Sequence, residues 1–188
     1  STYVQLADAI TQYERLIVVT PYPDQVEALL DARLSKEQME RVIFNQCPTN
    51  DTWARDHGFI TLVEKGNDTE GKEGKEENRV VLLDFQFNGW GKKFRADLDN
   101  KINRSLYDNG IVKGEYVDLN DFVLEGGSIE SDGKGTVFTT SCCLLAPNRN
   151  QPLSREDIEQ KLKLYLQAER IIWIDYGELL SLIHISEP

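Results

Sequence analysis

The 188 residues, 40% of them hydrophobic and 28% charged, suffice for one domain with a core of its own, and no apolar run approaches the ~20 residues of a membrane span. The net charge of −11 argues against nucleic acid and an anionic membrane as partners, and it suits a small cationic substrate. Three cysteines (Cys47, Cys142 and Cys143) and two histidines form neither a disulfide framework nor a zinc-binding pattern, so we expect a cytoplasmic protein without metal or cofactor.

Helices and strands are expected to alternate in the first half of the chain. Apolar residues at helical spacing predict a helix over 3–13, and Pro23 suits the first turn of a second helix. Ser35 and Gln38 have the spacing of a capping box. Residues 64–79 are charged and glycine-rich, which indicates a mobile, solvated connection between two strands. The predicted strands of this half cover residues 16–19, 42–45, 59–63 and 80–87.

The same alternation continues in the second half. Apolar spacing predicts a helix over 98–106 that ends near Gly110, and Ser154 is expected to cap a later helix. Asp132-Gly133-Lys134-Gly135 is typical of a hairpin turn. The predicted strands cover residues 111–118, 122–125, 127–131, 136–141 and 171–174. The order strand, strand, helix, strand occurs more than once, which favours an α+β fold with helices outside short sheets.

The stretch Asn50-Asp51-Thr52-Trp53-Ala54-Arg55-Asp56-His57-Gly58 concentrates polar groups between two apolar runs. Burying such groups is costly unless they pair with one another or hold a ligand. One interpretation is an ion pair of Arg55 with Asp51 or Asp56 at the end of a strand. The other interpretation is a binding site, and the stretch alone leaves both open.

A second acidic motif is Leu124-Glu125-Gly126-Gly127-Ser128. Its glycines would let the backbone turn sharply and approach a ligand closely, although a plain turn with an exposed Glu125 would have the same sequence. A guanidinium group suits two such carboxylates, because it is planar and offers N–H donors in a fork. A tryptophan face could cover the cation, with Trp53 and Trp90 as candidates. Core packing is the alternative role for Trp90.

Four motifs occur in the order expected of one family: residues 50–58, Asp-Phe-Gln-Phe-Asn-Gly-Trp-Gly-Lys (84–92), Leu-Glu-Gly-Gly-Ser (124–128) and Leu-Ala-Pro-Asn-Arg-Asn (145–150). Together they resemble the agmatine deiminases and the related bacterial peptidylarginine deiminases. The resemblance implies a pentein fold, in which five modules ring a central active site, and about three modules would lie in residues 1–180. It also implies Asp56 and Glu125 as the guanidinium-binding carboxylates of the catalytic site, with Trp53 lining the pocket. We expect Arg55 to be structural and His57 not to be catalytic.

Chemistry in the resembling family is covalent: a cysteine thiolate attacks the guanidinium carbon, and a His-x-Asp pair serves as the base. His184 precedes Ser186 by two residues and cannot form that pair, and Cys142 and Cys143 fall on a predicted strand rather than at the nucleophile's place. Residues 181–188 resemble sequencing-adaptor read-through, and the chain begins inside a predicted helix. We therefore expect an incomplete deiminase with a non-native tail and a missing N-terminus, which is inactive alone.

The resemblance implies agmatine as the substrate, with N-carbamoylputrescine and ammonia as the products. Two alternatives stay open from the sequence. One is a bacterial peptidylarginine deiminase, which would act on the same group in a protein. The other is a non-catalytic pentein module that only binds guanidinium or a protein. A homo-oligomer of the full-length protein is also left open.

Overall fold

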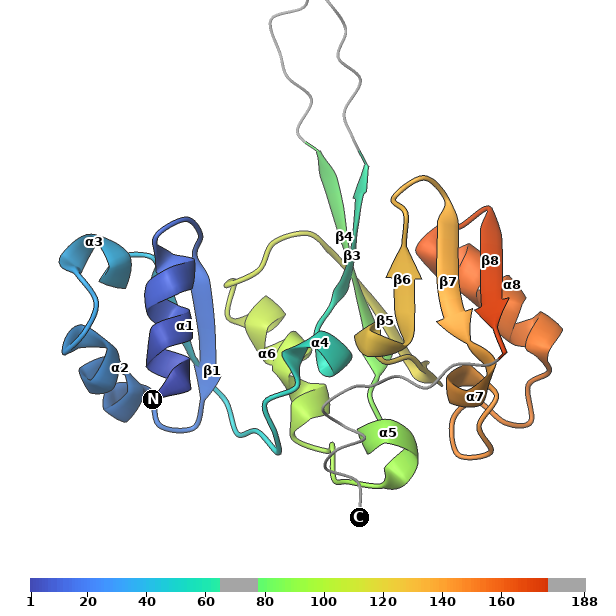
Figure 1. Cartoon of the computed structure of the whole chain (residues 1–188), viewed down its shortest axis with the longest axis horizontal. Coiled ribbons are helices and arrows are strands. Elements are labelled where there is room, and N and C mark those ends of the chain that lie inside the picture. Colours follow the sequence, from blue (N-terminus) through green and yellow to red (C-terminus); the bar gives the residue numbers. More distant parts are fainter. Residues whose placement is uncertain (65–77, 176–188) are drawn as a thin grey trace, which may run out of the picture.

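Three small sheets lie side by side in the computed structural model, which describes residues 1–64 and 78–175 (Figure 1). The strands are β1 Leu16–Thr20, β2 Val42–Gln46, β3 Ile60–Glu64, β4 Arg79–Gln86, β5 Glu115–Val123, β6 Ile129–Ser131, β7 Thr136–Thr140 and β8 Arg170–Ile174. The helices are α1 Thr2–Thr11, α2 Pro23–Asp31, α3 Lys36–Met39, α4 Ala54–His57, α5 Gly89–Lys92, α6 Ile102–Asp108, α7 Ser141–Leu144 and α8 Arg155–Leu166. Two 3-10 turns are η1 Asp99–Lys101 and η2 Gly126–Ser128.

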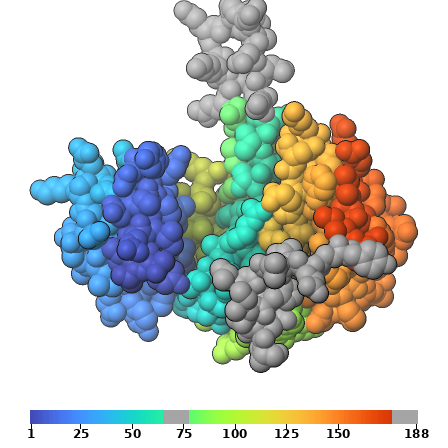
Figure 2. Space-filling view, in the orientation of Figure 1, coloured from blue at the N-terminus to red at the C-terminus, as the bar shows by residue number. Residues whose placement is uncertain are grey.

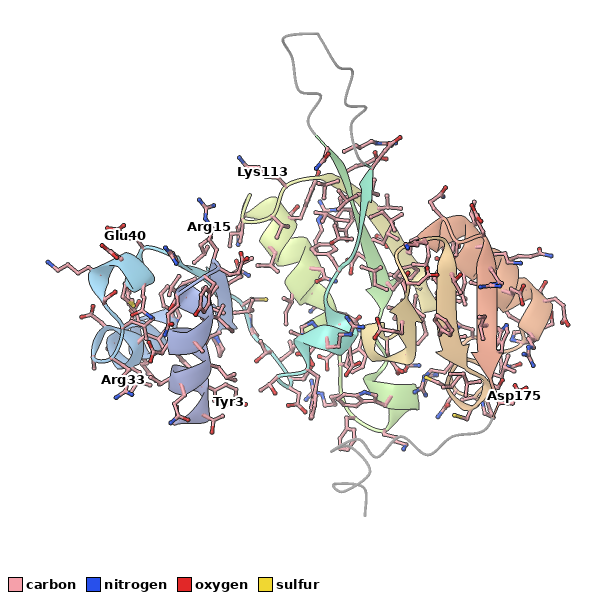
Figure 3. All side chains as sticks on the ribbon, turned by 45° about the horizontal axis from the view of Figure 1, so that its top comes forward. Tyr3, Arg15, Arg33, Glu40, Lys113 and Asp175 are labelled. Carbon is pink, nitrogen blue, oxygen red and sulfur yellow. The ribbon has the colours of Figure 1, made fainter. Side chains whose placement is uncertain are left out.

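The first unit packs α1, α2 and α3 around the parallel pair β1–β2. Pro23 opens α2, and Ser35 and Gln38 form the capping box of α3, as the sequence predicts. α1 buries Ala7 but leaves Tyr3, which is labelled in Figure 3, and neighbouring apolar side chains exposed. The apolar residues that predicted this helix are therefore largely exposed, because only Ala7 and Thr11 of α1 are buried. The whole unit is the blue part of the space-filling view in Figure 2.

The second and third units share one topology. In each, an antiparallel hairpin (β3–β4 or β6–β7) is followed by helix and then by a strand parallel to the second hairpin strand (β5 or β8). This repetition confirms the predicted order of elements and the α+β class. The closure of such units into a ring of five stays a prediction, and residues 65–77 and 181–188, for which a mobile connection and a non-native tail are expected, lie outside the described residues.

One apolar core joins the second and third units, and it is continuous from the β4–β5 pair to α8. Phe122, Leu124, Leu144, Ile158 and Leu162 are its most deeply buried side chains. Ser154 and Asp157 form the capping box that starts α8 and so direct Ile158 and Leu162 into this core. The two units therefore hold the segment after β5 between them, and this segment carries Glu125.

Two strands predicted at 111–118 and 122–125 are wrong, because β5 is a single strand. Its pairing with β4 shifts register after Phe85, so that Phe85 faces Leu119 and Gln86 faces Val123. The irregularity accommodates residues 119–121, which lie between the two predicted strands. The helix predicted at 98–106 is also divided into η1 and α6, because Asp99 accepts backbone hydrogen bonds from the 50–51 segment.

The strands predicted at 127–131 and 136–141 are both shorter than expected. Residues 126–128 form η2, so that β6 begins only at Ile129. β7 ends at Thr140, where its partner β8 ends, and the chain then turns into α7. Ser141 donates to Asp175 at the end of β8, which is labelled in Figure 3. The placement of Cys142 and Cys143 on a strand is therefore wrong: both lie on α7, Cys142 exposed and Cys143 partly buried.

Candidate active site

The 50–58 motif folds into a tight turn that ends in α4. Asp99 Oδ1 accepts from the backbone N–H groups of Asn50 (2.7 Å) and Asp51 (3.3 Å), while Asn50 Oδ1 accepts from Leu98 N at 2.8 Å. These reciprocal hydrogen bonds satisfy backbone N–H groups that no helix or strand pairs between β2 and α4 and before η1. The turn brings Asp56 and His57 into the interior and leaves Trp53 half-buried at the start of α4.

Asp56 is a buried carboxylate without an ion-pair partner in the described part of the chain. It is 6% exposed, and its Oδ1 accepts from the Gly127 backbone N–H at 3.0 Å. Burial raises the pKa of Asp56, and the Gly127 amide and the Trp90 side chain act in the opposite direction. The ion pair considered for Arg55 with Asp51 or Asp56 is not formed. Arg55 lies 3.8 Å from Glu130 instead, in an exposed pair.

Gly126 and Gly127 let α4 approach the segment after β5. A Cβ atom on Gly126 would overlap the Arg55 carbonyl oxygen, and one on Gly127 would overlap Asp56 Oδ1. The glycines thus permit a close contact between two motifs 71 residues apart in the sequence, whereas the predicted close approach to a ligand stays a prediction. The alternative of an ordinary turn with an exposed Glu125 is wrong, because Glu125 is 4% exposed.

Glu125 is paired with Arg149 and touches Cys143. Arg149 Nη2 lies 3.0 Å from Oε1 and donates to Oε2 at 3.2 Å, and Cys143 Sγ donates to Oε2 at 3.3 Å. Oε1 is buried and has no aligned hydrogen bond to any described residue. Burial, reinforced by Glu125, raises the pKa of the Cys143 thiol to about 12, which makes this cysteine a poor nucleophile at neutral pH.

Trp90 lies beside Asp56 in α5, which is a strained loop (the Trp90 loop) rather than a regular helix. Gly89, Trp90, Gly91 and Lys92 all have positive φ, between 56° and 85°, and two of these four residues are not glycine. The Trp90 ring makes edge-to-face contacts with Phe87, Phe94 and Trp53, at centroid distances of 4.9, 5.8 and 5.9 Å. Trp90 therefore belongs to an aromatic cluster and also borders the Asp56 carboxylate, while its covering of a bound cation stays a prediction.

Residues 148–150 were not recognised as functional from the sequence, although they lie in one of the four motifs. Asn88 Nδ2 donates to the Asn148 carbonyl at 2.8 Å, and Asn148 Nδ2 donates to the Gly91 carbonyl, so this segment braces the Trp90 loop. Asn150 binds the N–H and the C=O of Val123, at 2.8 and 2.9 Å, two residues before Glu125. Only the family motif could have pointed to these residues, because hydrogen bonds to backbone groups so far away in the sequence produce no local sequence pattern.

His57 is buried next to Asp56 in the sequence, and the two side chains form no hydrogen bond with each other. Burial lowers the pKa of His57, and the nearby Asp99 opposes this shift. Its Nδ1 has no hydrogen-bond partner among the described residues. Residues 1–64 and 78–175 contain no group of three side chains placed to hold a metal ion. Over the same ranges, no helix is long and apolar enough to cross a membrane.

The site thus combines two buried carboxylates, one arginine and two tryptophans from all four motifs. Asp56 and Trp53 come from α4 and the residue before it, and Trp90 comes from α5. Glu125 lies between β5 and η2, and Arg149 lies in the loop before α8. The electrostatic character is acidic, with one internal counter-charge. Such an arrangement can bind a planar cation between carboxylates and aromatic rings.

Known proteins match this chain along almost its whole length. The family model of the Porphyromonas-type peptidyl-arginine deiminases matches residues 1–182. A Mycoplasma capricolum protein named "Putative agmatine deiminase" is 35% identical over 99% of this chain and 49% of its own length. The chain spans about half the length of the curated relatives it matches, with 43–49% of each covered in the first three.

Solved structures of deiminases also superimpose on this chain. The "Putative Arginine Deiminase from Porphyromonas gingivalis" superimposes with a TM-score of 0.82 and 42% identity, over 94% of this chain and 48% of that chain. An agmatine deiminase of C. jejuni with substrate bound gives a TM-score of 0.76 and 35% identity, over 94% of this chain and 47% of that chain. The chain therefore belongs to the Porphyromonas-type peptidyl-arginine deiminase family and is similar throughout its described length to agmatine deiminases.

Proposed function

We propose that this chain supplies the substrate-binding carboxylates of an agmatine deiminase, which hydrolyses agmatine to N-carbamoylputrescine and ammonia. The observation that carries the proposal is the convergence of Asp56 and Glu125 on η2. Glu125 directly precedes η2, and Gly127 of η2 donates its backbone N–H to Asp56. Two carboxylates held this way can orient a guanidinium group and fix its plane. Trp53 and Trp90 would cover its faces or the aliphatic stem.

The proposed chemistry follows that of the family. A thiolate attacks the guanidinium carbon, ammonia leaves with a proton from a histidine, and water hydrolyses the resulting thiouronium. Asp56 and Glu125 would hold the positive charge throughout, so that the carbon stays accessible to the nucleophile. Cys143 does not suit the role of nucleophile, because its pKa is raised to about 12 and its proton is directed at Glu125.

We propose that the nucleophilic cysteine and the His-x-Asp pair come from sequence outside these 188 residues. His57 is followed two residues later by Phe59, and His184 by Ser186. The relatives are about twice as long as this chain, which leaves room for both elements in the unmatched half. The chain alone is then expected to bind guanidinium compounds without turning them over.

The test compares the 188-residue chain with a version extended along its gene to the length of the relatives. Both are incubated with agmatine, and ammonia and N-carbamoylputrescine are measured. We expect product only from the extended protein, and we expect Asp56→Asn and Glu125→Gln to abolish it. Product formed by the short chain, or by the extended Asp56→Asn variant at the unsubstituted rate, would overturn the proposal.

A peptidyl-arginine deiminase is the second candidate, because the matching family model and one of the structural relatives are described as such. The same carboxylates would then bind the guanidinium of an arginine side chain. An arginine-containing peptide assayed in parallel with agmatine separates the two: preference for the peptide in kcat/KM supports the second candidate, and preference for agmatine supports the first.

A further inference from the structure

The Glu125–Arg149 pair is the most deeply buried ion pair among the described residues, with side-chain exposures of 4% and 10%. The other ion pairs described have side chains that are roughly one-third to four-fifths exposed. Burying two charges is costly, and such a pair is often no more stable than apolar residues in its place. Because Glu125 is itself a proposed substrate-binding carboxylate, we looked for a functional role of its partner Arg149.

Hydrogen bonds from Arg149 and Cys143 occupy Oε2 of Glu125 and leave Oε1 without an aligned donor among the described residues. Oε2 accepts from Arg149 Nη2 and from Cys143 Sγ, whereas Oε1 lies near Nη2 but has no hydrogen bond of good geometry. A buried carboxylate oxygen without such a bond can accept one from an N–H of a ligand. Asp56 is also only partly engaged, through Gly127 N to Oδ1.

Arg149 also adjusts the charge of the site to that of its proposed ligand. Asp56 and Glu125 would together carry two negative charges when ionised, and Arg149 compensates one of them. The net charge of one negative unit matches a single guanidinium cation. Because the Arg149 fork is planar and its neighbours Asn148 and Asn150 are fixed to the Trp90 loop and to Val123, its position is set from both sides.

We propose that Arg149 is a positioning residue for guanidinium recognition: it holds the Oε2 edge of Glu125 so that Oε1 remains the acceptor for the substrate. The proposal rests on the proposed function, because it assigns Glu125 to the substrate. Its consequence is selectivity. A correctly oriented Glu125 distinguishes a planar guanidinium from a plain ammonium, whereas a freely rotating carboxylate attracts both alike.

The experiment titrates the 188-residue chain with agmatine and, separately, with putrescine, which carries an ammonium in place of the guanidinium. Binding is followed by the NMR signals of the indole N–H groups of Trp53 and Trp90. Trp173 serves as an internal reference, because its Nε1 donates to Glu159 in the third unit, away from the site. The variants are Arg149→Gln and Arg149→Lys. Tyr116→Phe is the control, since it removes a part-buried hydrogen bond to Asp84 without touching Glu125.

We expect the unsubstituted chain and Tyr116→Phe to prefer agmatine by at least about tenfold, the contribution of one charge-assisted hydrogen bond. In Arg149→Gln the ratio should collapse towards one, even where loss of the positive charge tightens the binding of both ligands. Arg149→Lys keeps the charge without the fork and should recover only part of the ratio. An unchanged ratio in Arg149→Gln would overturn the positioning role alone. No preference in the unsubstituted chain would overturn the proposed function itself, and the inference with it.

Discussion

Asp56 and Glu125 are buried to a similar degree and lie beside the same pair of glycines, but they are held in different ways. Glu125 has partners from the segment that follows it, Cys143 and Arg149, one of them of opposite charge. Asp56 accepts a hydrogen bond from a backbone N–H of a distant motif, and the neighbouring Arg55 pairs with Glu130 at the surface. The charge of Glu125 is therefore compensated by an arginine, whereas the cost of burying Asp56 is offset in part by the Gly127 amide and the Trp90 side chain.

This difference suggests a division of labour between the two acids. A carboxylate whose charge is unpaired in the free protein gains most from an incoming cation, because the ligand relieves its desolvation. A carboxylate that is already paired contributes orientation. We therefore expect Asp56 to provide most of the electrostatic attraction and Glu125 most of the geometric selection.

The largest effect is expected from breaking the buried pair. Arg149→Leu leaves the Glu125 carboxylate buried without its counter-ion, which should lower the free energy of unfolding by about 3–5 kcal/mol. Asp56→Asn removes no ion pair and keeps an acceptor for Gly127 N, so its cost should stay below about 1.5 kcal/mol. Urea denaturation of both variants measures the comparison. Equal losses would show that the two carboxylates are held alike.

A smaller loss is expected where the two motifs meet. Gly126→Ala places a methyl group on the Arg55 carbonyl, and the overpacking should cost about 1–3 kcal/mol while moving α4 away from η2. The matched control is Gly133→Asn in the β6–β7 turn, where φ is +66° and the space is open. Asparagine tolerates this conformation, so the control should stay within about 0.5 kcal/mol. A control that loses as much as Gly126→Ala would remove the special role of the contact.

The raised pKa of Asp56 predicts a pH dependence of binding. Guanidinium binding needs the carboxylate, so agmatine affinity should fall as the pH is lowered through a value above the 3.8 of an ordinary aspartate, by about tenfold per pH unit below it. The sign for folding is opposite: the folded state binds this proton more tightly, so the contribution of Asp56 to stability decreases as the pH rises through its raised pKa. Titrations with agmatine over a pH series measure the first effect. Persistence of the same step in Asp56→Asn would assign it to another group.

The smallest effect is expected at the surface ion pair. Arg55 and Glu130 have side-chain exposures of 66% and 79%, and solvent screens their 3.8 Å contact. Arg55→Ala or Glu130→Ala should therefore change the free energy of unfolding by less than about 1 kcal/mol, in contrast to Arg149→Leu. A double-mutant cycle by urea denaturation measures the coupling. A coupling as large as that of the buried pair would contradict the assignment of Arg55 to a minor structural role.

The sequence allowed prediction of those parts of the fold whose signals are local. The capping boxes at Ser35 and Ser154 form as expected, and so does the turn at Gly133, because each depends on residues within three or four positions. The failures concern pairing over longer separations. β5 continues across a register shift of its partner β4, and α7 begins where the pairing of β7 with β8 ends at Thr140.

The same distinction holds for the candidate site. Asp56 and Glu125 could be singled out through the resemblance of the four motifs to the deiminases, because each acidic stretch alone left an ion pair or a plain turn open. Arg149 could not be assigned a partner, because it lies 24 residues after Glu125 and its approach depends on how residues 148–150 brace the Trp90 loop and Val123. Gly126 and Gly127 were recognised as permitting a close approach, but the neighbour is α4, which only the tertiary structure could reveal.

The central claim, that Asp56 and Glu125 together bind a guanidinium group, is tested most directly by titrating the chain with agmatine while following the indole N–H signals of Trp53, Trp90 and Trp173. We predict that Trp53 and Trp90 respond and Trp173 does not, and that the response is lost in both Asp56→Asn and Glu125→Gln variants that remain folded. A response that persists in either folded variant, or its absence in the unsubstituted chain up to the solubility limit of agmatine, would contradict the claim.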